Sequence, residues 1–265
     1  MIKKVGYLGP EGSYSQLAAN EMCPDYKKVA YESFYLVMQS LKSGETDAIV
    51  LPIENTLNGG VLQNIDLLQY TDGVIAVREC TVKVDHRLIT FKGANLANIT
   101  KIYSHQQAIA QCSKYIYENY PNAKLITTPS TSGCVEMIKS YTEAGIVGPH
   151  FKADGYEVST FSIADEQSNS THFLLIERGI ISEDKSCNKI YFSFTCQHEP
   201  GALLKMLSLI STLNLTKIES RPIKEKVGEY RFFIETDGDY SKTEVKAVIN
   251  RLKERATSFK ILGCY

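Results

Sequence analysis

The sequence has 265 residues, of which 43% are hydrophobic and 22% are charged. That length accommodates two domains, and the composition is that of an ordinary globular chain, which excludes extensive disorder. The formal net charge is −1, but residues 187–265 hold 13 Lys and Arg against 9 Asp and Glu, a net of +4, so the rest carries −5. No basic stripe indicates a nucleic-acid partner, and local donors must hold any anionic ligand of the first part.

Targeting signals and cysteine usage indicate the cellular compartment of the protein. No apolar run of about 18 residues is present, which argues against a membrane span. The N-terminus, MIKKVGYLGP, enters a strand-like pattern directly, without the apolar core of a secretory signal. The seven cysteines are scattered and never spaced C-x-x-C, which argues against a disulfide framework and a zinc site. We expect a cytoplasmic protein in which most cysteines are small buried residues.

Residues 1–180 alternate short β-type runs with helical patterns. The expected strands cover 3–8, 48–51, 81–89, 101–103, 124–127, 144–147 and 172–176. The expected helices cover 13–22, 34–43, 60–70, 105–118 and 131–140. Such alternation predicts an α/β architecture with largely parallel sheets. The polar stretch 179–189 breaks the pattern and is interpreted as a linker.

Residues 189–265 change character. Apolar and polar residues alternate over 190–196, which is the period of a strand with one buried face. A helical stripe follows Pro200-Gly201, an extended run covers 215–223, and a second alternation follows Gly228. A second helix and a last strand complete the order β-α-β-β-α-β. This order predicts a ferredoxin-like fold, in which helices cover one face of an antiparallel sheet.

Four polar clusters lie where an expected strand gives way to an expected helix. They cover residues 9–15, 54–60, 104–107 and 129–132. Helix N-termini offer unpaired N–H groups and the positive end of the helix dipole, and in parallel sheets these loops share one edge. Together the clusters favour a small anion such as a carboxylate as ligand. Each cluster alone is more simply explained as N-cap or turn chemistry.

Six segments carry a resemblance to a known family. Four of them, YLGPEGSYS (7–15), LPIENT (51–56), YSH to QC (103–112) and NSTHF (169–173), resemble the ordered motifs of prephenate dehydratases. The other two, GALL (201–204) and ESRP (219–222), resemble the phenylalanine-binding segments of the ACT domain that follows in this family. Six motifs in one order are specific, whereas any one alone would be weak. The resemblance covers nearly the whole chain.

The resemblance implies a fold for each part. Residues 1–180 would form a catalytic domain with two lobes, like a type II periplasmic binding protein, with the active site in the cleft between them. Lobe one would comprise 1–77 and 158–180, and lobe two 78–157. Residues 189–265 would form the ACT regulatory domain, with the ferredoxin-like βαββαβ fold.

The resemblance also implies a reaction. Such lyases convert prephenate to phenylpyruvate, water and carbon dioxide in phenylalanine biosynthesis, without a metal or an organic cofactor. Thr171 would deliver or relay the proton to the departing hydroxyl, by positioning rather than by intrinsic acidity. The residues implied to bind the substrate are Ser13, Asn55, Thr56, Ser104 and Gln111. Without the family, Thr171 fits ordinary strand composition and Gln111 a solvated helix position.

The regulatory half is implied to bind L-phenylalanine as a feedback effector. The residues implied to contact it are Gly201, Ala202, Leu203, Leu204, Glu219, Ser220, Arg221 and Pro222. Inhibition requires that the effector favour a less active state by its differential affinity. In the family two such domains pair, so a homodimer or homotetramer is expected, with prephenate as the substrate.

The sequence departs from the family motifs at three places. His172 stands where an arginine usually follows the threonine, Gln106 replaces a proline, and Ser13 replaces a threonine. Arogenate dehydratase, prephenate decarboxylase and a non-catalytic phenylalanine sensor remain alternative interpretations. For His86 and His105, a buried hydrogen bond or helix capping is favoured over acid–base chemistry.

Overall fold

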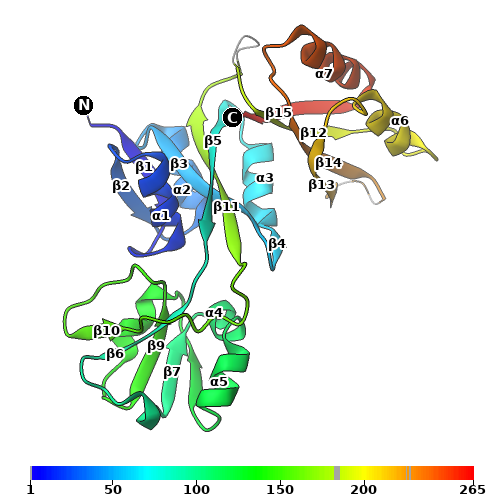
Figure 1. The fold of residues 1–265 in the computed structure, drawn as a ribbon. Helices are drawn as coiled ribbons and strands as arrows, with labels where there is room; N and C mark the ends of the chain where they lie inside the picture. The colour runs from blue at the N-terminus through cyan, green and yellow to red at the C-terminus, as the bar shows by residue number, and fades with distance from the viewer. Residues whose placement is uncertain (1, 182–185, 225, 227) are drawn as a thin grey trace. The chain divides into compact units, whose positions relative to one another are not determined.

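The computed structural model describes residues 2–181, 186–224, 226 and 228–265 (Figure 1). Part of the expected linker 179–189, residues 182–185, lies outside the described residues. The chain forms two compact units, unit 1 with residues 1–61 and 80–173, and unit 2 with residues 62–79 and 174–265. In the described part of the chain, no helix combines the length and apolar character needed to cross a membrane.

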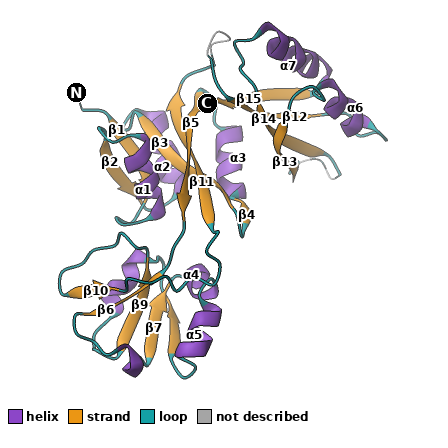
Figure 2. Cartoon of the chain, viewed as in Figure 1, coloured by secondary structure: helices purple, strands orange, loops and turns teal. Residues whose placement is uncertain are grey.

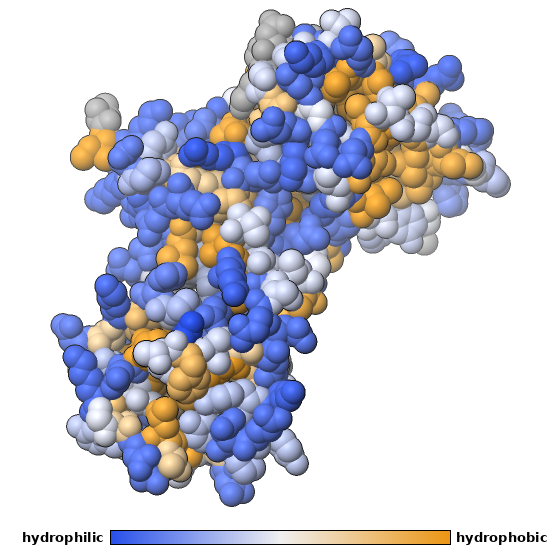
Figure 3. Space-filling view, viewed as in Figure 1, coloured by the Kyte–Doolittle hydropathy of each residue, from blue (hydrophilic) through white to orange (hydrophobic). Residues whose placement is uncertain are grey.

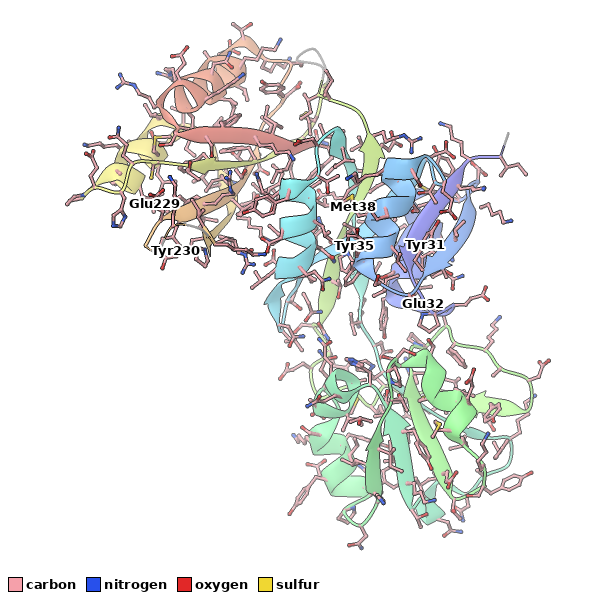
Figure 4. The ribbon with its side chains drawn as sticks, turned by 180° about the vertical axis from the view of Figure 1, so that it is seen from behind. Tyr31, Glu32, Tyr35, Met38, Glu229 and Tyr230 are labelled. Atoms are coloured by element: carbon pink, nitrogen blue, oxygen red, sulfur yellow. A yellow bond between two sulfur atoms is a disulfide. The ribbon has the colours of Figure 1, made fainter. Side chains whose placement is uncertain are left out.

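In the first sheet of unit 1, the pairing of β1 with its neighbours is parallel, as predicted, whereas the short β4 pairs antiparallel with β3. Strand β1 pairs in parallel with both β2 and β3, and helices α1 and α2 pack against these strands (Figure 2). Met38 of α2 is buried in this core, whereas Tyr35, one turn earlier, is exposed (Figure 4). The elements are β1 Lys4–Leu8, α1 Tyr14–Met22, β2 Lys27–Tyr31, α2 Phe34–Ser43, β3 Ala48–Asn55 and β4 Gly59–Gly60.

The second sheet of unit 1 has the strand order β10-β6-β9-β7-β8. Strand β7 is parallel to both of its neighbours, and β6 is antiparallel to β9 and β10. The elements are β6 Arg87–Phe91, the 3₁₀ helix Leu96–Asn98, β7 Lys101–Ser104, α4 Gln106–Ala110, α5 Ser113–Asn119, β8 Lys124–Thr127, the 3₁₀ helix Ser132–Met137, β9 Glu143–Val147 and β10 Tyr156–Val158. The 3₁₀ helix over Ser132–Met137 replaces the α-helix predicted over 131–140.

The strand predicted over 81–89 is interrupted. Strand β5 (Val74–Lys83) ends before Val84, and β6 begins at Arg87. The Val84 N–H donates instead to the carbonyl of Asn169, at 2.9 Å, and the His86 carbonyl accepts from the Ile163 N–H. The alternation of apolar residues continues through the break, so the pattern alone predicted one strand.

The helix predicted over 105–118 is also divided, into α4 and α5. Its second half is capped from a distance, because the Asp165 carboxylate accepts hydrogen bonds from the backbone N–H groups of Lys114 and Tyr115, at 2.9 and 3.1 Å. It also accepts from the hydroxyl of Ser113. A carboxylate at a helix N-terminus satisfies unpaired N–H groups and complements the helix dipole. This cap fixes a new helix start in the middle of the predicted helix.

Unit 2 contains the predicted β-α-β-β-α-β order. Strands β13-β14-β12-β15 form an antiparallel sheet, and β15 continues in parallel pairing to β5. The elements are α3 Leu62–Tyr70, β12 Lys189–Thr195, α6 Ala202–Leu209, β13 Leu215–Pro222, β14 Tyr230–Asp237, α7 Thr243–Arg255 and β15 Ser258–Cys264, together with residues of β5 and β11 (Ser170–Arg178), which both units share.

Strand β12 is buried on both faces, so the prediction of one buried face was wrong. Ile190, Phe192 and Phe194 pack in the core with residues of α6 and α7, as the alternation indicated. Tyr191 and Ser193 are also buried, and the Ser193 hydroxyl donates to the Gln69 side chain of α3, at 2.5 Å. Polar residues on the second face therefore cover another element rather than face water.

Helix α3 is held by the C-terminal part of the chain at two further points. The Lys260 ammonium group donates to the backbone carbonyls of Leu68, Gln69 and Thr71, at 3.2, 2.6 and 2.8 Å. A cation there satisfies the unpaired carbonyls at the end of the helix and complements its dipole. Arg221 of β13 forms a two-pronged ion pair with Asp66, at 2.8 and 3.4 Å. These contacts explain why residues 62–79 belong to unit 2.

The cysteines require a correction. Cys187 and Cys264 form a disulfide, with Cα atoms 5.6 Å apart and a sequence separation of 77. Cys187 precedes β12 and Cys264 ends β15, and antiparallel pairing of these strands brings the two together. The distant spacing hid this single bridge from sequence reasoning. The other five cysteines form no disulfide, and four of them are buried, as expected.

Candidate active site

The centre of the candidate site is the side-chain amide of Asn55, at the end of β3. Its nitrogen lies within hydrogen-bond distance of three oxygens, those of the Asn169 side chain, the Ser170 carbonyl and the Thr171 hydroxyl, at 2.8, 3.1 and 2.9 Å. Its oxygen accepts from the N–H groups of Leu57 and Asn58 and from the Asn58 side chain. Two segments more than 110 residues apart therefore meet at one buried amide.

Backbone groups determine which way the Asn55 amide points. The N–H groups of Leu57 and Asn58 can only donate, and the Ser170 carbonyl can only accept, so the amide nitrogen must face Ser170. The Thr171 Oγ1 atom then accepts from Asn55. Because this bond uses a lone pair of the hydroxyl, the Thr171 proton remains available to another acceptor.

Thr56 and Asn169 complete this junction. The Thr56 N–H donates to the Ser170 carbonyl at 2.9 Å, and the Ser170 N–H donates to the Thr56 hydroxyl at 3.0 Å. The structure thus brings together three predicted site residues, Asn55, Thr56 and Thr171. Sequence reasoning did not select Asn169, although it lies two positions before Thr171 in a motif already quoted.

Two other predicted residues bond to nearby backbone. The Ser13 hydroxyl caps α1, since it accepts from the Gln16 N–H at 3.3 Å and donates to the Leu8 carbonyl. The Ser104 hydroxyl is fully buried and donates to the Ile146 carbonyl, at 2.9 Å. The hydroxyl proton of Ser104 is therefore used in a hydrogen bond within the sheet, and only the lone pairs of the oxygen remain for other contacts.

Gln111 lies at the end of α4 and is bonded to a buried histidine. Its side-chain oxygen is 2.8 Å from Nε2 of His86. Burial lowers the pKa of His86, so its imidazole is neutral at pH 7. The neighbouring ring of Tyr14 makes an edge contact with His86, with ring centroids 6.5 Å apart. A series of side-chain contacts thus links Gln111, through His86 and Tyr14, to the loop that contains Ser13.

The two histidine predictions are confirmed. His86 makes the buried hydrogen bond just described, and His105 caps α4 by accepting from the Gln107 N–H, at 3.3 Å. Cys112, next to Gln111, is fully buried, and burial raises the pKa of its thiol far above neutrality. A thiol in that state is a packing residue rather than a nucleophile.

Beside His86, the charges of Asp85 and Arg87 are paired. Burial alone would raise the pKa of Asp85, but hydrogen bonds from Ser162 and Arg87 outweigh it and leave that pKa lowered. Arg87 Nη2 lies 2.8 Å from the Asp85 carboxylate, and the hydroxyl of Tyr14 donates to the Asp85 carbonyl. This cluster fixes the chain on both sides of His86.

The predicted effector segments lie in unit 2. Gly201 adopts a left-handed conformation, with φ of 78°, immediately before α6. Ala202 and Leu203 line a cavity of about 130 Å³, together with Gly228, Glu229 and Tyr230 at the start of β14 (Figure 4). Leu204 is exposed. The second segment, Glu219, Ser220, Arg221 and Pro222, ends β13 and contributes none of the described lining of this cavity.

Comparisons with known proteins identify a family. A model of the prephenate dehydratase family matches residues 5–180. The bifunctional chorismate mutase/prephenate dehydratase of Escherichia coli K12 is 32% identical, with 99% of this chain and 70% of that protein covered. Prephenate dehydratase of Lactococcus lactis is 31% identical, with 99% of this chain and 97% of that protein covered.

Solved structures extend the likeness over the whole chain. The prephenate dehydratase of Arthrobacter aurescens, determined in complex with L-Phe, is 27% identical with a TM-score of 0.88 and covers 99% of this chain and 89% of its own. The enzyme from Staphylococcus aureus is 26% identical with a TM-score of 0.82 and covers 99% of both chains. The chain therefore belongs to the prephenate dehydratase family.

Proposed function

We propose that this protein converts prephenate to phenylpyruvate, with Thr171 as the proton-delivering group. The observation that carries the proposal is the hydrogen bond from the Asn55 amide to Thr171 Oγ1, at 2.9 Å. This bond fixes the hydroxyl and leaves its proton available for the departing hydroxyl of the substrate. It also stabilises negative charge that develops on the oxygen as the proton leaves.

The reaction needs little beyond positioning. As the ring carboxylate leaves as carbon dioxide, its bonding electrons enter the ring, and the ring hydroxyl leaves as water after it takes up one proton. Aromatisation supplies the driving force, so a weak acid suffices if it is held at the leaving oxygen. Solvent then returns the proton to Thr171.

Neutral donors suit this substrate. Thr56 and Gln111 offer a hydroxyl and an amide, and helix α1 begins beside Ser13. Asn55 would act through Thr171, because its amide hydrogens are directed at protein oxygens. A cation fixed on the departing carboxylate would stabilise the ground state and slow its loss as carbon dioxide. We assign Ser13, Thr56, Gln111 and Ser104 to direct substrate binding, and Ser104 can take part only through its oxygen.

The catalytic part is assigned two lobes, residues 1–77 with 158–180 and residues 78–157. Two separate sheets in residues 4–158 support this division. The chain crosses between them near Val84 and again before Asn169, and these two crossings share a hydrogen bond. A short paired crossing of this kind is a suitable hinge for closure of a cleft.

L-phenylalanine is assigned as the feedback effector, bound by an ACT domain over residues 189–265. The L-Phe complex of the Arthrobacter aurescens relative supports this assignment. The cavity beside Ala202 and Leu203 would receive part of the effector, and the Glu219–Pro222 segment of a second copy would supply the rest. Apolar side chains gather on the surface near α6 (Figure 3), and Leu204, Ile218 and Tyr230 are exposed. These residues favour a homodimer or homotetramer.

The test is a direct assay. Purified protein is mixed with prephenate, and phenylpyruvate is followed by its absorbance in alkali. In parallel it is mixed with arogenate, and phenylalanine is followed by chromatography. Wild-type protein is expected to form phenylpyruvate, and Thr171→Ala is expected to lose about 10²- to 10⁴-fold in kcat. Product no faster than with the variant would refute the enzyme assignment. Calorimetry with L-phenylalanine tests the effector separately.

A further inference from the structure

The hydrogen bond between His86 and Gln111 leaves one imidazole nitrogen without a partner. Nε2 lies 2.8 Å from the Gln111 side-chain oxygen. Nδ1 is buried and makes no hydrogen bond with any described residue. His86 is only 3% exposed. The imidazole therefore has one nitrogen with a hydrogen-bond partner and one without a partner among the described residues, and water can hardly reach it.

This asymmetry assigns the tautomer. Because burial keeps the ring neutral, it carries a single N–H. A buried N–H without an acceptor is rarer and more costly than an unused lone pair. The proton therefore resides on Nε2, which donates to Gln111, and Nδ1 keeps its lone pair.

The tautomer in turn sets the direction of the Gln111 amide. With its oxygen occupied by the histidine, the amide presents its NH₂ group, which has no partner among the described residues. An amide turned the other way would present an oxygen, which repels a carboxylate. A protonated Nε2 thus makes Gln111 a donor.

The surroundings of His86 fix its position, so its ring can determine the direction of the Gln111 amide. Its carbonyl accepts from the Ile163 N–H at 2.9 Å, and the ring of Tyr14 contacts it edge-on. The preceding residue, Asp85, is fixed by Arg87 and Ser162. Gln111 itself is fixed through its backbone, since its carbonyl accepts from the Asp165 N–H at 2.9 Å.

We propose that His86 is a positioning residue that orients the Gln111 amide as a hydrogen-bond donor toward the anionic substrate. The proposal rests on the proposed function, because it takes prephenate as the ligand of Gln111. It assigns His86 no proton transfer and no direct contact with substrate. Its effect is on binding, and it acts through one hydrogen bond.

Steady-state kinetics of matched variants test the proposal. His86→Phe keeps a planar ring and removes the donor, and we expect KM for prephenate to rise about 10- to 100-fold with a smaller change in kcat, as for loss of one hydrogen bond to a charged group. His86→Gln places an amide NH₂ near the former Nε2 and should restore KM to within about threefold of wild type. Gln111→Ala should match His86→Phe, and the double variant should lose nothing further.

Independent measurements separate this proposal from the dehydratase assignment. Two-bond ¹H–¹⁵N spectra, with the His86 signals assigned from the His86→Gln variant, should show a protonated Nε2 and an unprotonated Nδ1 at pH 7. A protonated Nδ1, an unchanged KM in a folded His86→Phe variant, or additive losses in the double variant would overturn the proposal. An inactive wild-type enzyme would instead refute the proposed function, and the tautomer would still be decided by the spectra.

Discussion

The amide nitrogen of Asn55 lies 2.9 Å from the hydroxyl oxygen of Thr171, although 116 positions separate the two residues. The amide cannot rotate freely, because Leu57 and Asn58 hold its oxygen and Ser170 accepts from its nitrogen. Thr171 is thus presented to the site in one orientation. An alcohol with a high intrinsic pKa can serve as a proton donor only if it is fixed in this way.

Asn55→Asp should reduce activity, because a carboxylate oxygen would replace the donor that faces Thr171. The carboxylate keeps the size of the amide and can still accept from Leu57 and Asn58, but it cannot donate to Thr171. We expect kcat to fall about 10²- to 10³-fold, the usual effect of removing one fixed donor. Phenylpyruvate formation is the measurement, and Asn119→Ala, which removes an exposed amide that donates to the Tyr115 carbonyl, is the control. Equal activity in both variants would contradict the role given to Asn55.

Arg221→Lys should weaken unit 2 modestly. Lysine cannot reproduce the two-pronged contact with Asp66, but the pair is partly exposed, so the free energy of unfolding should fall by only about 1 kcal/mol. Urea denaturation without phenylalanine measures this change in the free energy of unfolding. Lys226→Ala, which breaks an exposed pair with Glu229, should change stability by less than about 0.5 kcal/mol. If the two variants lose the same amount, the Asp66 contact adds nothing.

Asp239 should contribute a pH-dependent share of stability. Hydrogen bonds from the Ser241 hydroxyl and N–H, and then from Cys187 and Ser186, lower its pKa from 3.8 to about 2. A lowered carboxyl pKa stabilises the folded state fully above the unfolded value, and this contribution disappears as the pH falls toward 2. Thermal unfolding between pH 5 and pH 2 should therefore show a shallower loss of stability for Asp239→Asn than for wild type. Parallel curves would exclude this role.

Counting thiols tests the disulfide. With Cys187 and Cys264 bonded, the protein purified without reductant and unfolded in guanidinium should react with thiol reagent at five cysteines. After reduction it should react at all seven. Closing a loop of this length is worth about 4 kcal/mol in the chain-entropy model, so reduction should also lower the unfolding temperature. Seven reactive thiols before reduction would show that the bridge does not form.

Local sequence patterns correctly predicted the helices and strands whose structure depends mainly on residues close in sequence. The alternation over 190–196 and the order of strands and helices after it required only nearest-neighbour reasoning, and the observed elements agree. Likewise β1, α1, α2 and β8 lie within a residue of their predicted ranges. In each of these, the hydrophobic period and the caps indicate the same structure.

Long-range contacts explain what the sequence did not show. The break at Val84–His86 depends on Asn169, and the start of α5 depends on Asp165, about 50 residues away. The tie between Asn55 and Thr171 was reached only through family motifs, because nothing in their local sequence links them. The partner of Gln111 was likewise hidden, since His86 lies in a stretch that reads as continuous strand.

The attachment of α3 to the C-terminal part has a practical consequence for anyone who wants an unregulated enzyme. A truncation after residue 180 would remove Lys260, Arg221 and Ser193 together. It would expose the end of α3 with its carbonyls unsatisfied and leave Asp66 without its cation. Such a shortened protein should express poorly and aggregate, and its low activity would say nothing about feedback. Point substitutions around Gly201 are therefore the appropriate route to a deregulated, well-folded biocatalyst.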